Sequence, residues 1–447
     1  MRRSRWLIGC IVASCIVCGI FLTTSVPPSA EASSPVGQLE QAPTVIWNPP
    51  PADPADPHGR GYVPSSFALT HLSARVPQRG AAPLASRFDW RDQNKVTYVQ
   101  NQGTCGSCYA FASLATFESQ LLIKGGGTFD FSENNLAECN YEETGCNGGN
   151  MWQAANYMAT KGVVAESCDP YNQADESCKT TCTPLKNVTD MWVLYGHAVP
   201  PVDSLKTWIQ TFGPIYVTIN AGGNDSWGQE FSNYNGSYTL YNPSSDPSTT
   251  NHAVLIVGWD DSLTHAGGTG GWIVKNSWGT GWGNNGYFYI AYGSAAIGCD
   301  ASFIQNWQDY SASNTLLYRD EAGVKTSVGW QGTTSAYGLV KLSPASAGCV
   351  KAVEIWTVDA TSGVKVEIYD SFNGSSLSSK LWEKDNISFD YAGYHRIPLE
   401  TPLSLAAGND VYVKVKFADV SSAYGIPVDT VGPKAAGYSY VSQSGAD

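Results

Sequence analysis

Apolar side chains recur at helical spacing in three segments of the first half of the chain. Between residues 108 and 124 they repeat every three or four positions, and a run of three glycines follows. Glycine is common where helices end, so this pattern predicts a helix that begins at Cys108. Two further helices are expected at 150–161, after a Gly-Gly turn, and at 204–212, before a Gly-Pro pair.

From residue 215 the pattern changes to short apolar runs that glycine and asparagine separate. These runs predict strands at 215–219, 253–259, 271–278 and 286–292. Helices followed by strands are typical of an α+β domain with two lobes and a cleft between them.

Beyond residue 310 apolar and polar positions alternate in several short segments with turns between them. No convincing helix appears in this part of the chain. We therefore expect a separate all-β sandwich domain at 310–447.

The N-terminal segment has the pattern of an export signal. Three arginines among the first five residues precede a nearly continuous apolar run at 6–22, and Ala30 and Ala32 follow. This pattern predicts a signal peptide (1–30), cleaved after about Ala30 or Ala32, and a secreted or extracytoplasmic cell-surface protein. Two alternatives remain open: the run approaches the length of an uncleaved membrane anchor, and Val12–Cys15 resembles a lipoprotein processing site.

Residues 31–82 are rich in proline, alanine and serine and show no sustained apolar periodicity. This composition predicts a pro-segment or linker. With 447 residues, the chain is long enough for two domains beside such processing segments.

Composition narrows the classes of function. Charged residues make up 15% of the chain and aromatic residues 12%, which suits a large core and argues against disorder over most of the length. The formal net charge is −13. Because an acidic surface repels a phosphate backbone, we expect no nucleic-acid partner.

One motif concentrates reactive chemistry at the start of the first predicted helix. The run QNQGTCGSCYAF places Cys108 at the helix N-terminus, where the helix dipole lowers the pKa of a thiol and favours the thiolate. Gln102 can offer its side-chain amide to an oxyanion, and the backbone N–H of Cys108 can supply a second donor.

A thiolate nucleophile needs a partner that stores and returns a proton. Among six histidines, His252 is the best placed because it opens an apolar strand at the predicted cleft. Asn276 can accept the other N–H of its ring, and Trp278 can shield that hydrogen bond from water. The other histidines are expected to be solvated or part of the core: His58, His71, His197, His265 and His395.

Four blocks of sequence occur in an order that is known from one family: QNQGTCGSCYAF, GCNGG, NHAVLIVGW and VKNSWGTGWGNNGYFYI. They resemble the blocks of the papain family of cysteine peptidases. The resemblance covers about half of the chain. It implies a two-lobe catalytic domain at 83–305, with a helical left lobe and a β-rich right lobe, that uses no cofactor.

The resemblance also implies roles for individual residues. Cys108 would be the nucleophile and His252 the general acid and base, while Asn276 would orient the imidazole ring. Gln102 would donate to the oxyanion.

Substrate-binding residues follow from the same resemblance. Gly148 and Gly149 would pair with the substrate backbone as an added strand. Met151 would line the pocket for the second residue upstream of the cut. Asn251 and Trp278 lie within the matching blocks, beside the catalytic residues, and are expected to contact the substrate.

Nine cysteines remain beyond the signal peptide, which suggests four disulfides and one free thiol in an exported protein. The resemblance implies the first pairing and favours the second, and proximity and elimination suggest the others. The expected disulfides are Cys105–Cys146, Cys139–Cys178, Cys168–Cys182 and Cys299–Cys349, with Cys108 free. No paired CxxC with downstream histidines occurs, so we expect no metal site.

The segment 310–447 loosely resembles the lectin-like β domains that follow papain-like domains in some microbial surface or secreted proteins. Its aromatic side chains could stack on sugar rings, which would give a glycan or cell-surface partner, or they could pack in the core. These residues are Trp330, Tyr337, Trp356 and Trp382.

The main hypothesis is an exported cysteine endopeptidase that cleaves protein or peptide substrates through a Cys108 acyl-enzyme. Two alternatives stay open. One is a surface adhesin or glycan-binding protein with an inactive peptidase domain. The other is a thiol acyltransferase that passes the acyl group to an amine.

Overall fold

The computed structural model describes residues 9–15, 38–77, 83–433 and 436–445. The chain divides into two compact units. We call Thr44–Tyr310 the α+β unit, and Met1–Pro43 with Ser311–Asp447 the β unit. Within the described ranges, no helix is long and apolar enough to span a membrane. The predicted signal cleavage site lies outside the described residues.

The predicted helices of the α+β unit are present with ends within two residues of the expected ones. Two seven-residue helices were missed, because so short a segment shows no helical period. The helices are α1 (Cys108–Lys124), α2 (Glu133–Cys139), α3 (Met151–Thr160), α4 (Val202–Phe212) and α5 (Ser226–Ser232). Gly125 ends α1 in the left-handed conformation (φ 73°), as the glycine run predicted.

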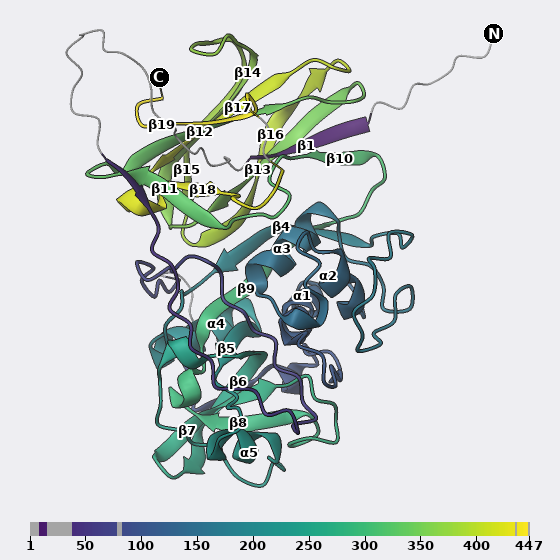
Figure 1. The fold of residues 1–447 in the computed structure, drawn as a ribbon, viewed down its shortest axis with the longest axis vertical. Coiled ribbons are helices and arrows are strands. Elements are labelled where there is room, and N and C mark those ends of the chain that lie inside the picture. The colour runs from purple at the N-terminus through teal and green to yellow at the C-terminus, as the bar shows by residue number, and fades with distance from the viewer. Residues whose placement is uncertain (1–8, 16–37, 78–82, 434–435, 446–447) are drawn as a thin grey trace. The chain divides into compact units, whose positions relative to one another are not determined.

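An antiparallel sheet forms the other part of the α+β unit, with strand order β4-β9-β5-β6-β7-β8 and the short β3 beside β6. The strands are β3 (Arg87–Asp89), β4 (Lys186–Val193), β5 (Ile215–Ile219), β6 (His252–His265), β7 (Gly268–Lys275), β8 (Tyr287–Ala291) and β9 (Cys299–Asp309). Figure 1 shows α1, α2 and α3 on one side of this unit and β5 to β8 on the other. The expected α+β fold is confirmed.

Helix α1 is buried from Cys108 to Leu121, so it is the central helix of the unit. It packs against β5, β6 and β9 as well as α2 and α3. A helix that is buried on all sides holds its first residue in a fixed position, which matters because that residue is Cys108.

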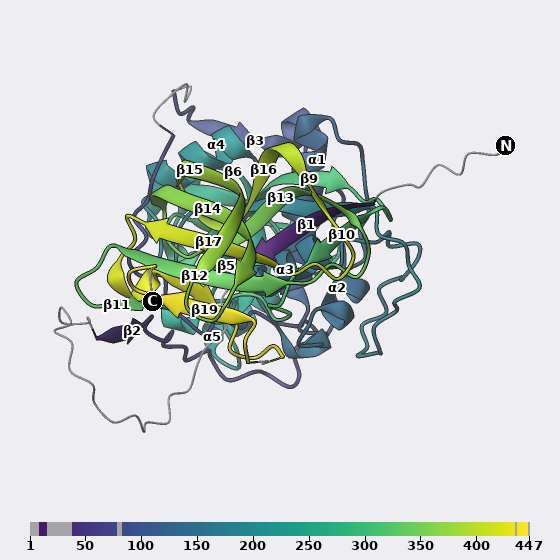
Figure 2. The same cartoon turned by 90° about the horizontal axis from the view of Figure 1, so that it is seen from above.

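The β unit contains strands without any α-helix in its described residues, as the alternation predicted. They form three sheets, with orders β18-β11-β2, β15-β14-β17-β12-β19 and β10-β1-β13-β16. Their bounds are β1 (Gly9–Cys15), β2 (Leu39–Gln41), β10 (Asn314–Leu317), β11 (Thr326–Trp330), β12 (Ser335–Leu342), β13 (Gly348–Thr357), β14 (Thr361–Phe372), β15 (Leu377–Phe389), β16 (Ala392–Leu405), β17 (Val411–Ala418), β18 (Ile426–Val428) and β19 (Ser439–Ser442). Seen from above, β15, β14, β17 and β12 lie side by side (Figure 2).

One apolar core serves all three sheets of the β unit. Fully buried valines such as Val340, Val353 and Val366 come from β12, β13 and β14 and pack in a single cluster. Strands of three sheets that surround one shared core form the expected all-β sandwich.

Candidate active site

Cys108 is the first residue of α1 and is completely buried. Its sulfur accepts hydrogen bonds from two backbone N–H groups, those of Gly61 at 3.2 Å and Ala253 at 3.3 Å. Ser107 precedes the helix, and its hydroxyl lies 2.6 Å from the hydroxyl of Tyr171. The sulfur therefore lies where the helix N-terminus meets the start of β6.

Disulfides fix the loops around this helix start. The bond Cys105–Cys146 ties the loop before Cys108 to the turn that carries Gly148 and Gly149. The structure also contains the expected bonds Cys139–Cys178 and Cys168–Cys182.

The fourth expected disulfide, Cys299–Cys349, is wrong. Cys299 is a free thiol, buried at the start of β9 where it is in register with Thr218 of β5, and Cys349 is disulfide-bonded elsewhere. Pairing by elimination was wrong here because Cys108 is not the single free thiol. Among the described residues two cysteines are free, Cys108 and Cys299.

His252 and Asn276 lie together as the sequence predicted. His252 opens β6 and Asn276 follows the last residue of β7, and the pairing of Leu255 with Lys275 brings these ends of the two strands close together. Nε2 of His252 lies 2.8 Å from Oδ1 of Asn276, and the ring of Trp278 covers the imidazole at a centroid distance of 5.0 Å. Nδ1 of His252 is buried and has no hydrogen-bond partner in the described part of the chain.

Gln102 is held in one orientation by a residue that the sequence reasoning missed. The hydroxyl of Ser277 donates to Oε1 of Gln102 at 2.5 Å, so the amide nitrogen must point the other way. That nitrogen donates to the carbonyl oxygens of Cys105 at 2.8 Å and Gly59 at 3.1 Å. The position of Ser277, directly after Asn276, was the available signal.

The site is not open, because residues 56–63 run through it. We call this stretch the covering segment. Gly149 donates to the carbonyl of Gly61 at 2.9 Å, and its own carbonyl accepts from Val63 at 3.0 Å. Tyr62 donates its backbone N–H to the carbonyl of Asn251 at 3.1 Å. Two of the expected substrate-binding residues thus bind the protein's own chain.

Two glycines allow the covering segment to approach the site. An added Cβ at Gly59 would lie 2.1 Å from the carbonyl oxygen of Cys105, and one at Gly61 would lie 1.6 Å from that of Gly106. Both contacts are with backbone atoms, which cannot move aside as a flexible side chain would. The sequence Gly-Arg-Gly is therefore required for this path, and it was the signal that the sequence reasoning overlooked.

Side chains fasten the covering segment at its start. Arg60 forms an ion pair with Asp56 at 2.8 Å and donates to the hydroxyl of Ser232 at 2.9 Å. The ring of His58 stacks on Trp278 with centroids 4.3 Å apart and planes at 7°. His58 was expected to be solvated or part of the core, and instead it covers the residue that shields the predicted catalytic pair.

The remaining expected substrate-binding residues border this path. Gly148 precedes α3 in a conformation with φ 97°, where an added Cβ would lie 2.8 Å from the carbonyl oxygen of Gly61. Met151 is the first residue of α3 and is buried. Its role in a pocket stays a prediction.

Burial changes the protonation of the predicted catalytic pair. It raises the pKa of the Cys108 thiol to about 11, although backbone N–H groups partly oppose the change. It lowers the pKa of His252 to about 3. In the covered state both groups are neutral near pH 7, so the thiolate expected from the helix dipole does not form. Desolvation outweighs the dipole here.

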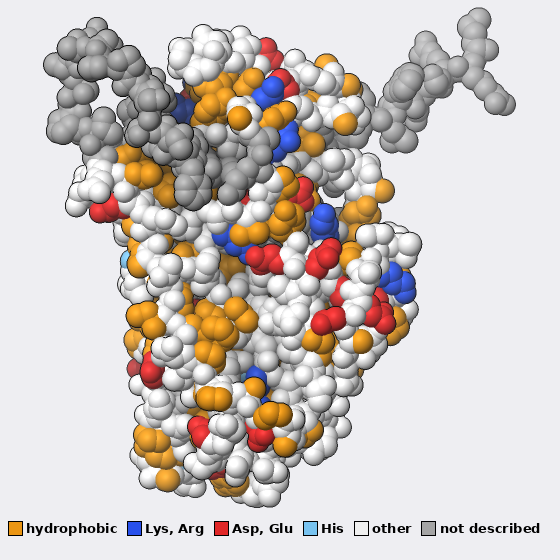
Figure 3. All heavy atoms as spheres, viewed as in Figure 1, with side chains coloured by type: hydrophobic (Ala, Val, Ile, Leu, Met, Phe, Trp, Pro, Cys, Tyr) orange, Lys and Arg blue, Asp and Glu red, His pale blue; other side chains and the backbone are white. Residues whose placement is uncertain are grey.

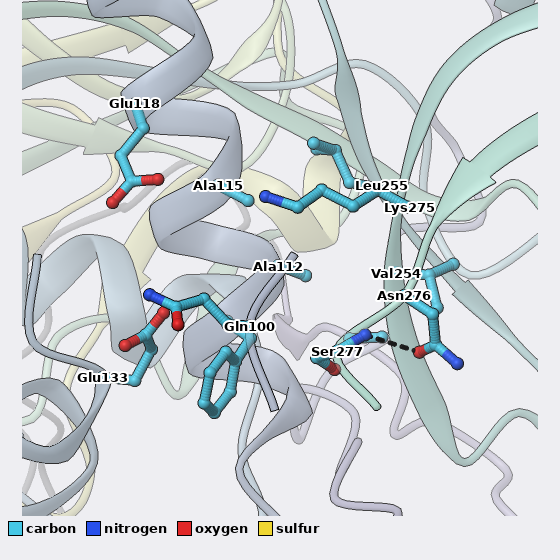
Figure 4. A pocket seen from close by; sticks show the side chains of 12 residues that line it. Gln100, Ala112, Ala115, Glu118, Glu133, Val254, Leu255, Lys275, Asn276 and Ser277 are labelled. Atoms are coloured by element: carbon cyan, nitrogen blue, oxygen red, sulfur yellow. Dashed lines mark hydrogen bonds between the residues drawn. The ribbon is translucent and has the colours of Figure 1, made fainter. Parts of the chain in front are cut away.

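A buried charged cluster lies behind Asn276 and joins the two halves of the unit. Lys275 of β7 donates to Thr97 at 3.2 Å, and Thr97 donates to the carboxylate of Glu118 on α1 at 2.7 Å. Figure 4 shows Lys275 pointing toward α1 beside Asn276, with Glu118 and Glu133 around the same pocket. Burial raises the pKa of Glu118 to about 7 and lowers that of Lys275. The cluster ties the strand that carries Asn276 to the helix that carries Cys108.

Comparison with known proteins agrees with this geometry. The family model "Papain family cysteine protease" matches residues 84–306, and the model "Lectin like domain" matches residues 317–447. Digestive cysteine proteinase 2 of Homarus americanus is 35% identical over 242 residues, which are 52% of this chain and 68% of that protein. Cathepsin J of Mus musculus is 35% identical over 249 residues, which are 54% of this chain and 66% of that protein.

A solved structure has the fold of both units. It contains the cysteine protease and lectin-like domains of Cwp84, a surface layer associated protein of Clostridium difficile, and matches with a TM-score of 0.69. The match covers 92% of this chain and 94% of that one at 20% identity. The sequence match, the ordered blocks, the position of Cys108 at the start of α1 and the contact of His252 with Asn276 lead to one conclusion: the chain belongs to the papain family of cysteine proteases and carries a lectin-like domain after its protease domain.

Proposed function

We propose that this protein is an exported endopeptidase that is made in a closed form and hydrolyses peptide bonds through an acyl-enzyme on Cys108. The observation that carries the proposal is the amide nitrogen of Gln102, which already donates to a peptide carbonyl, that of Gly59, two residues before the N–H group that contacts the Cys108 sulfur. An oxyanion site that fits a peptide carbonyl next to a nucleophile is the central requirement of acyl transfer.

The proposed reaction uses two bond exchanges. His252 takes the thiol proton of Cys108, and the sulfur then attacks the substrate carbonyl carbon while Gln102 and the backbone N–H of Cys108 bind the oxyanion. The peptide C–N bond then breaks, and His252 gives its proton to the leaving amine. A water molecule that loses a proton to His252 cleaves the thioester and restores the thiol, and Asn276 holds the imidazole ring through both steps.

The covering segment explains why the closed form would be silent. The atom that faces the sulfur at 3.2 Å is the amide N–H of Gly61, and attack requires a carbonyl carbon in that place. The covering segment also forms a parallel bridge between Tyr62 and Gly149. The segment is therefore bound in the site with an N–H group, and not a carbonyl carbon, at the Cys108 sulfur, so it would not be cleaved.

Export is proposed from the N-terminal pattern and from the disulfides. Arginines followed by an apolar run are typical of secretory signals, and three disulfides in one unit suit an oxidising compartment. Acidic side chains gather over the helical side of the α+β unit on the face in Figure 3, and such a surface repels polyanions.

The test is a cleavage assay on the processed protein, with a thiol-reactive epoxide as an active-site probe. We expect peptide hydrolysis, and mass spectrometry should place the epoxide on Cys108. With an added amine acceptor, the products should remain free carboxylic acids, because water completes the reaction. Amine-linked products would instead support the acyltransferase alternative.

A Cys108→Ala variant is the control for this assay. It should neither cleave peptide nor bind the epoxide, while its thermal unfolding stays close to that of the wild type. Full activity of this variant would contradict the proposal. If the wild-type protein cleaves nothing but binds glycans, the inactive-adhesin alternative is favoured.

A second function is proposed for the β unit, because one pocket there is lined by aromatic rings and hydroxyl groups. Tyr337, Tyr369, Phe372 and Tyr440 line it, with Phe372 and Tyr440 edge to face at 5.0 Å. Lys414 lies over the ring of Tyr337 at 5.1 Å. Three serine hydroxyls complete the lining: Ser375, Ser376 and Ser442. We propose that this pocket binds a carbohydrate, since rings stack on sugar faces while hydroxyls bind sugar hydroxyls.

The other aromatic candidates from the sequence do not line this pocket. Trp330 and Trp356 are buried in the β unit, and Trp382 packs against its apolar core. They are therefore part of the interior, which was one of the two alternatives.

A glycan array with the full-length Cys108→Ala protein checks the carbohydrate proposal. We expect selective binding that a Tyr440→Ala change lowers by about tenfold or more, because stacking on a ring contributes on the order of 1–2 kcal/mol. A Tyr238→Ala change removes an exposed tyrosine of the α+β unit and should leave binding unaltered. Equal binding by all three proteins, or none by any, would contradict the proposal.

A further inference from the structure

The side chain of Tyr62 fills a buried space beside Gly149 and Asn251, and only 2% of this residue is exposed. Its hydroxyl donates to Oδ2 of Asp300 at 2.7 Å. Its ring lies 6.5 Å from that of His197, with planes at 19°. We call this space, bounded by Asp300, His197 and Thr218, the tyrosine site.

Asp300 is held firmly in the tyrosine site. The same oxygen, Oδ2, also lies 2.9 Å from Nδ1 of His197 and accepts from the hydroxyl of Thr218 at 3.2 Å. The backbone of Asp300 is in the left-handed region (φ 52°) that non-glycine residues seldom adopt, and its N–H donates to the carbonyl of Gly196 at 3.0 Å. A strained, multiply bonded carboxylate is typical of a functional position.

The groups that bound the tyrosine site do not belong to the covering segment. Thr218 lies on β5 and Asp300 on β9, which are neighbouring strands of the same sheet. They and His197 therefore remain when the covering segment leaves, and a carboxylate oxygen then loses the phenol that it had bound. A substrate side chain that enters this space meets the same groups.

We propose that the tyrosine site selects tyrosine at the second residue upstream of the cleaved bond, with Asp300 as the residue that determines this specificity. The inference rests on the proposed peptidase function and names the substrates of that activity. The position follows from the bridge between Tyr62 and Gly149, since Gly149 is an expected partner of the substrate backbone and lies two residues before Met151, the residue expected to line the pocket for that substrate position.

Phenylalanine should be a poor substitute at this position. It fills the same volume, but it removes the shortest of the three hydrogen bonds to Oδ2 of Asp300. A site that is built to bind a hydroxyl group disfavours the analogue that lacks it, because a hydrogen bond to a buried charged group is lost and not replaced.

Lysine and arginine should also be disfavoured, despite the carboxylate. Burial opposes protonation of His197, but the carboxylate of Asp300, together with the backbone of Pro247 and the charge of Asp246, raises the pKa of this histidine. Whenever His197 is protonated it balances the charge of Asp300, so a cationic substrate would then place a second positive charge in a buried space. Tyrosine brings a neutral donor and a ring that lies nearly parallel to that of His197.

The first test compares peptide substrates that differ only in Tyr, Phe or Arg at the second position upstream of the cut. With the processed wild-type protein we expect kcat/KM for Tyr to exceed that for Phe by about tenfold or more, and Arg to be poorer than Tyr. In an Asp300→Ala variant the Tyr-to-Phe ratio should fall to about one, mostly through KM. Asp203→Ala, which removes an exposed carboxylate of the same unit, should keep the wild-type ratio.

The result that overturns the inference is a wild-type preference for Phe or Arg, or a Tyr-to-Phe ratio that survives in Asp300→Ala. Epoxide labelling of Cys108 shows that each variant is folded around its active site. A wild-type protein that cleaves no peptide at all contradicts the proposed function instead.

A second measurement, the melting temperature, tests the contact between Tyr62 and Asp300 without catalysis. In the full-length Cys108→Ser protein, Tyr62→Phe should lower the melting temperature by about 2 to 4 °C. In the same protein with Asp300→Ala, the further change Tyr62→Phe should have little effect, since the two groups act as a pair. Equal and additive effects would show that Asp300 does not recognise the phenol.

Discussion

Full-length protein with Gly61→Ala should hydrolyse peptides at least a hundredfold faster than full-length wild type. An alanine Cβ at this position would lie 1.6 Å from the carbonyl oxygen of Gly106 and 2.0 Å from its carbon, so the covering segment cannot keep its path. As it lifts, the N–H of Gly61 leaves the sulfur of Cys108 and the carbonyl of Gly59 leaves Gln102. The measurement is the initial rate, with a gel to show that the chain is still intact.

The same variant should show a change in thiol chemistry. Burial raises the pKa of Cys108 to about 11 in the covered state, so at pH 6 to 7 the thiol is protonated and reacts slowly. When Cys108 is exposed to solvent, burial no longer raises the pKa of its thiol. The helix dipole and an imidazolium partner, which both stabilise the thiolate, then lower this pKa. Alkylation by iodoacetamide at pH 6 to 7 should therefore be faster in Gly61→Ala by about tenfold or more.

A matched glycine provides the control. Gly281 belongs to the same unit, and an added Cβ there would meet no atom within 4 Å. Gly281→Ala should therefore stay as inactive and as slowly alkylated as the full-length wild type. If Gly61→Ala also stayed inactive while folding normally, residues 56–63 would not be the element that keeps the site closed.

The second large effect is expected at His252. In the Gly61→Ala background, adding His252→Ala should lower kcat/KM by about 10⁴-fold, because the site loses both the base that activates Cys108 and the acid that protonates the leaving amine. Using this background avoids any need for the protein to process itself. The assay is hydrolysis of one fluorogenic peptide between pH 4 and 9.

The pH profile separates this role from a structural one. With His252 present, activity should fall at both ends of the pH range, since the reaction needs a thiolate and an imidazolium together. The His252→Ala protein should lose this bell shape along with its rate. His265→Ala, at a half-buried histidine of the same unit, should change kcat/KM by no more than about twofold. A small loss at His252 would contradict the assigned role.

Local patterns were enough to place the parts of the site that belong to regular elements. Cys108 lies at a helix start, His252 at a strand start and Asn276 at a strand end, and each position follows from the period of its own segment. Strand pairing then brings Nε2 of His252 to 2.8 Å from Oδ1 of Asn276. These contacts could be predicted because the sheet aligns its strands in register.

Other parts of the site depend on contacts that no local pattern reports. Residues 56–63 have no period, because most of their backbone hydrogen bonds go to residues far away in the chain, such as Gly149 and Asn251. Asp300 was overlooked for a similar reason, because its hydrogen-bond partner Tyr62 is 238 positions away in the sequence. The predicted disulfide of Cys299 was wrong because it rested on the number of cysteines alone, and this number does not distinguish a buried free thiol from a bonded one.

The placement of β2 has a consequence for the timing of activation. The covering segment belongs to the polypeptide that it closes, so dilution cannot release it, and a tethered ligand acts at an effective concentration in the millimolar range. Just before it in the chain, Leu39–Gln41 pair with β11 in the β unit. A chain that is cut once after the covering segment therefore keeps that peptide anchored and able to return to the site. Peptidase activity should therefore appear only some time after this cleavage, when β2 has itself been cut or has dissociated from β11.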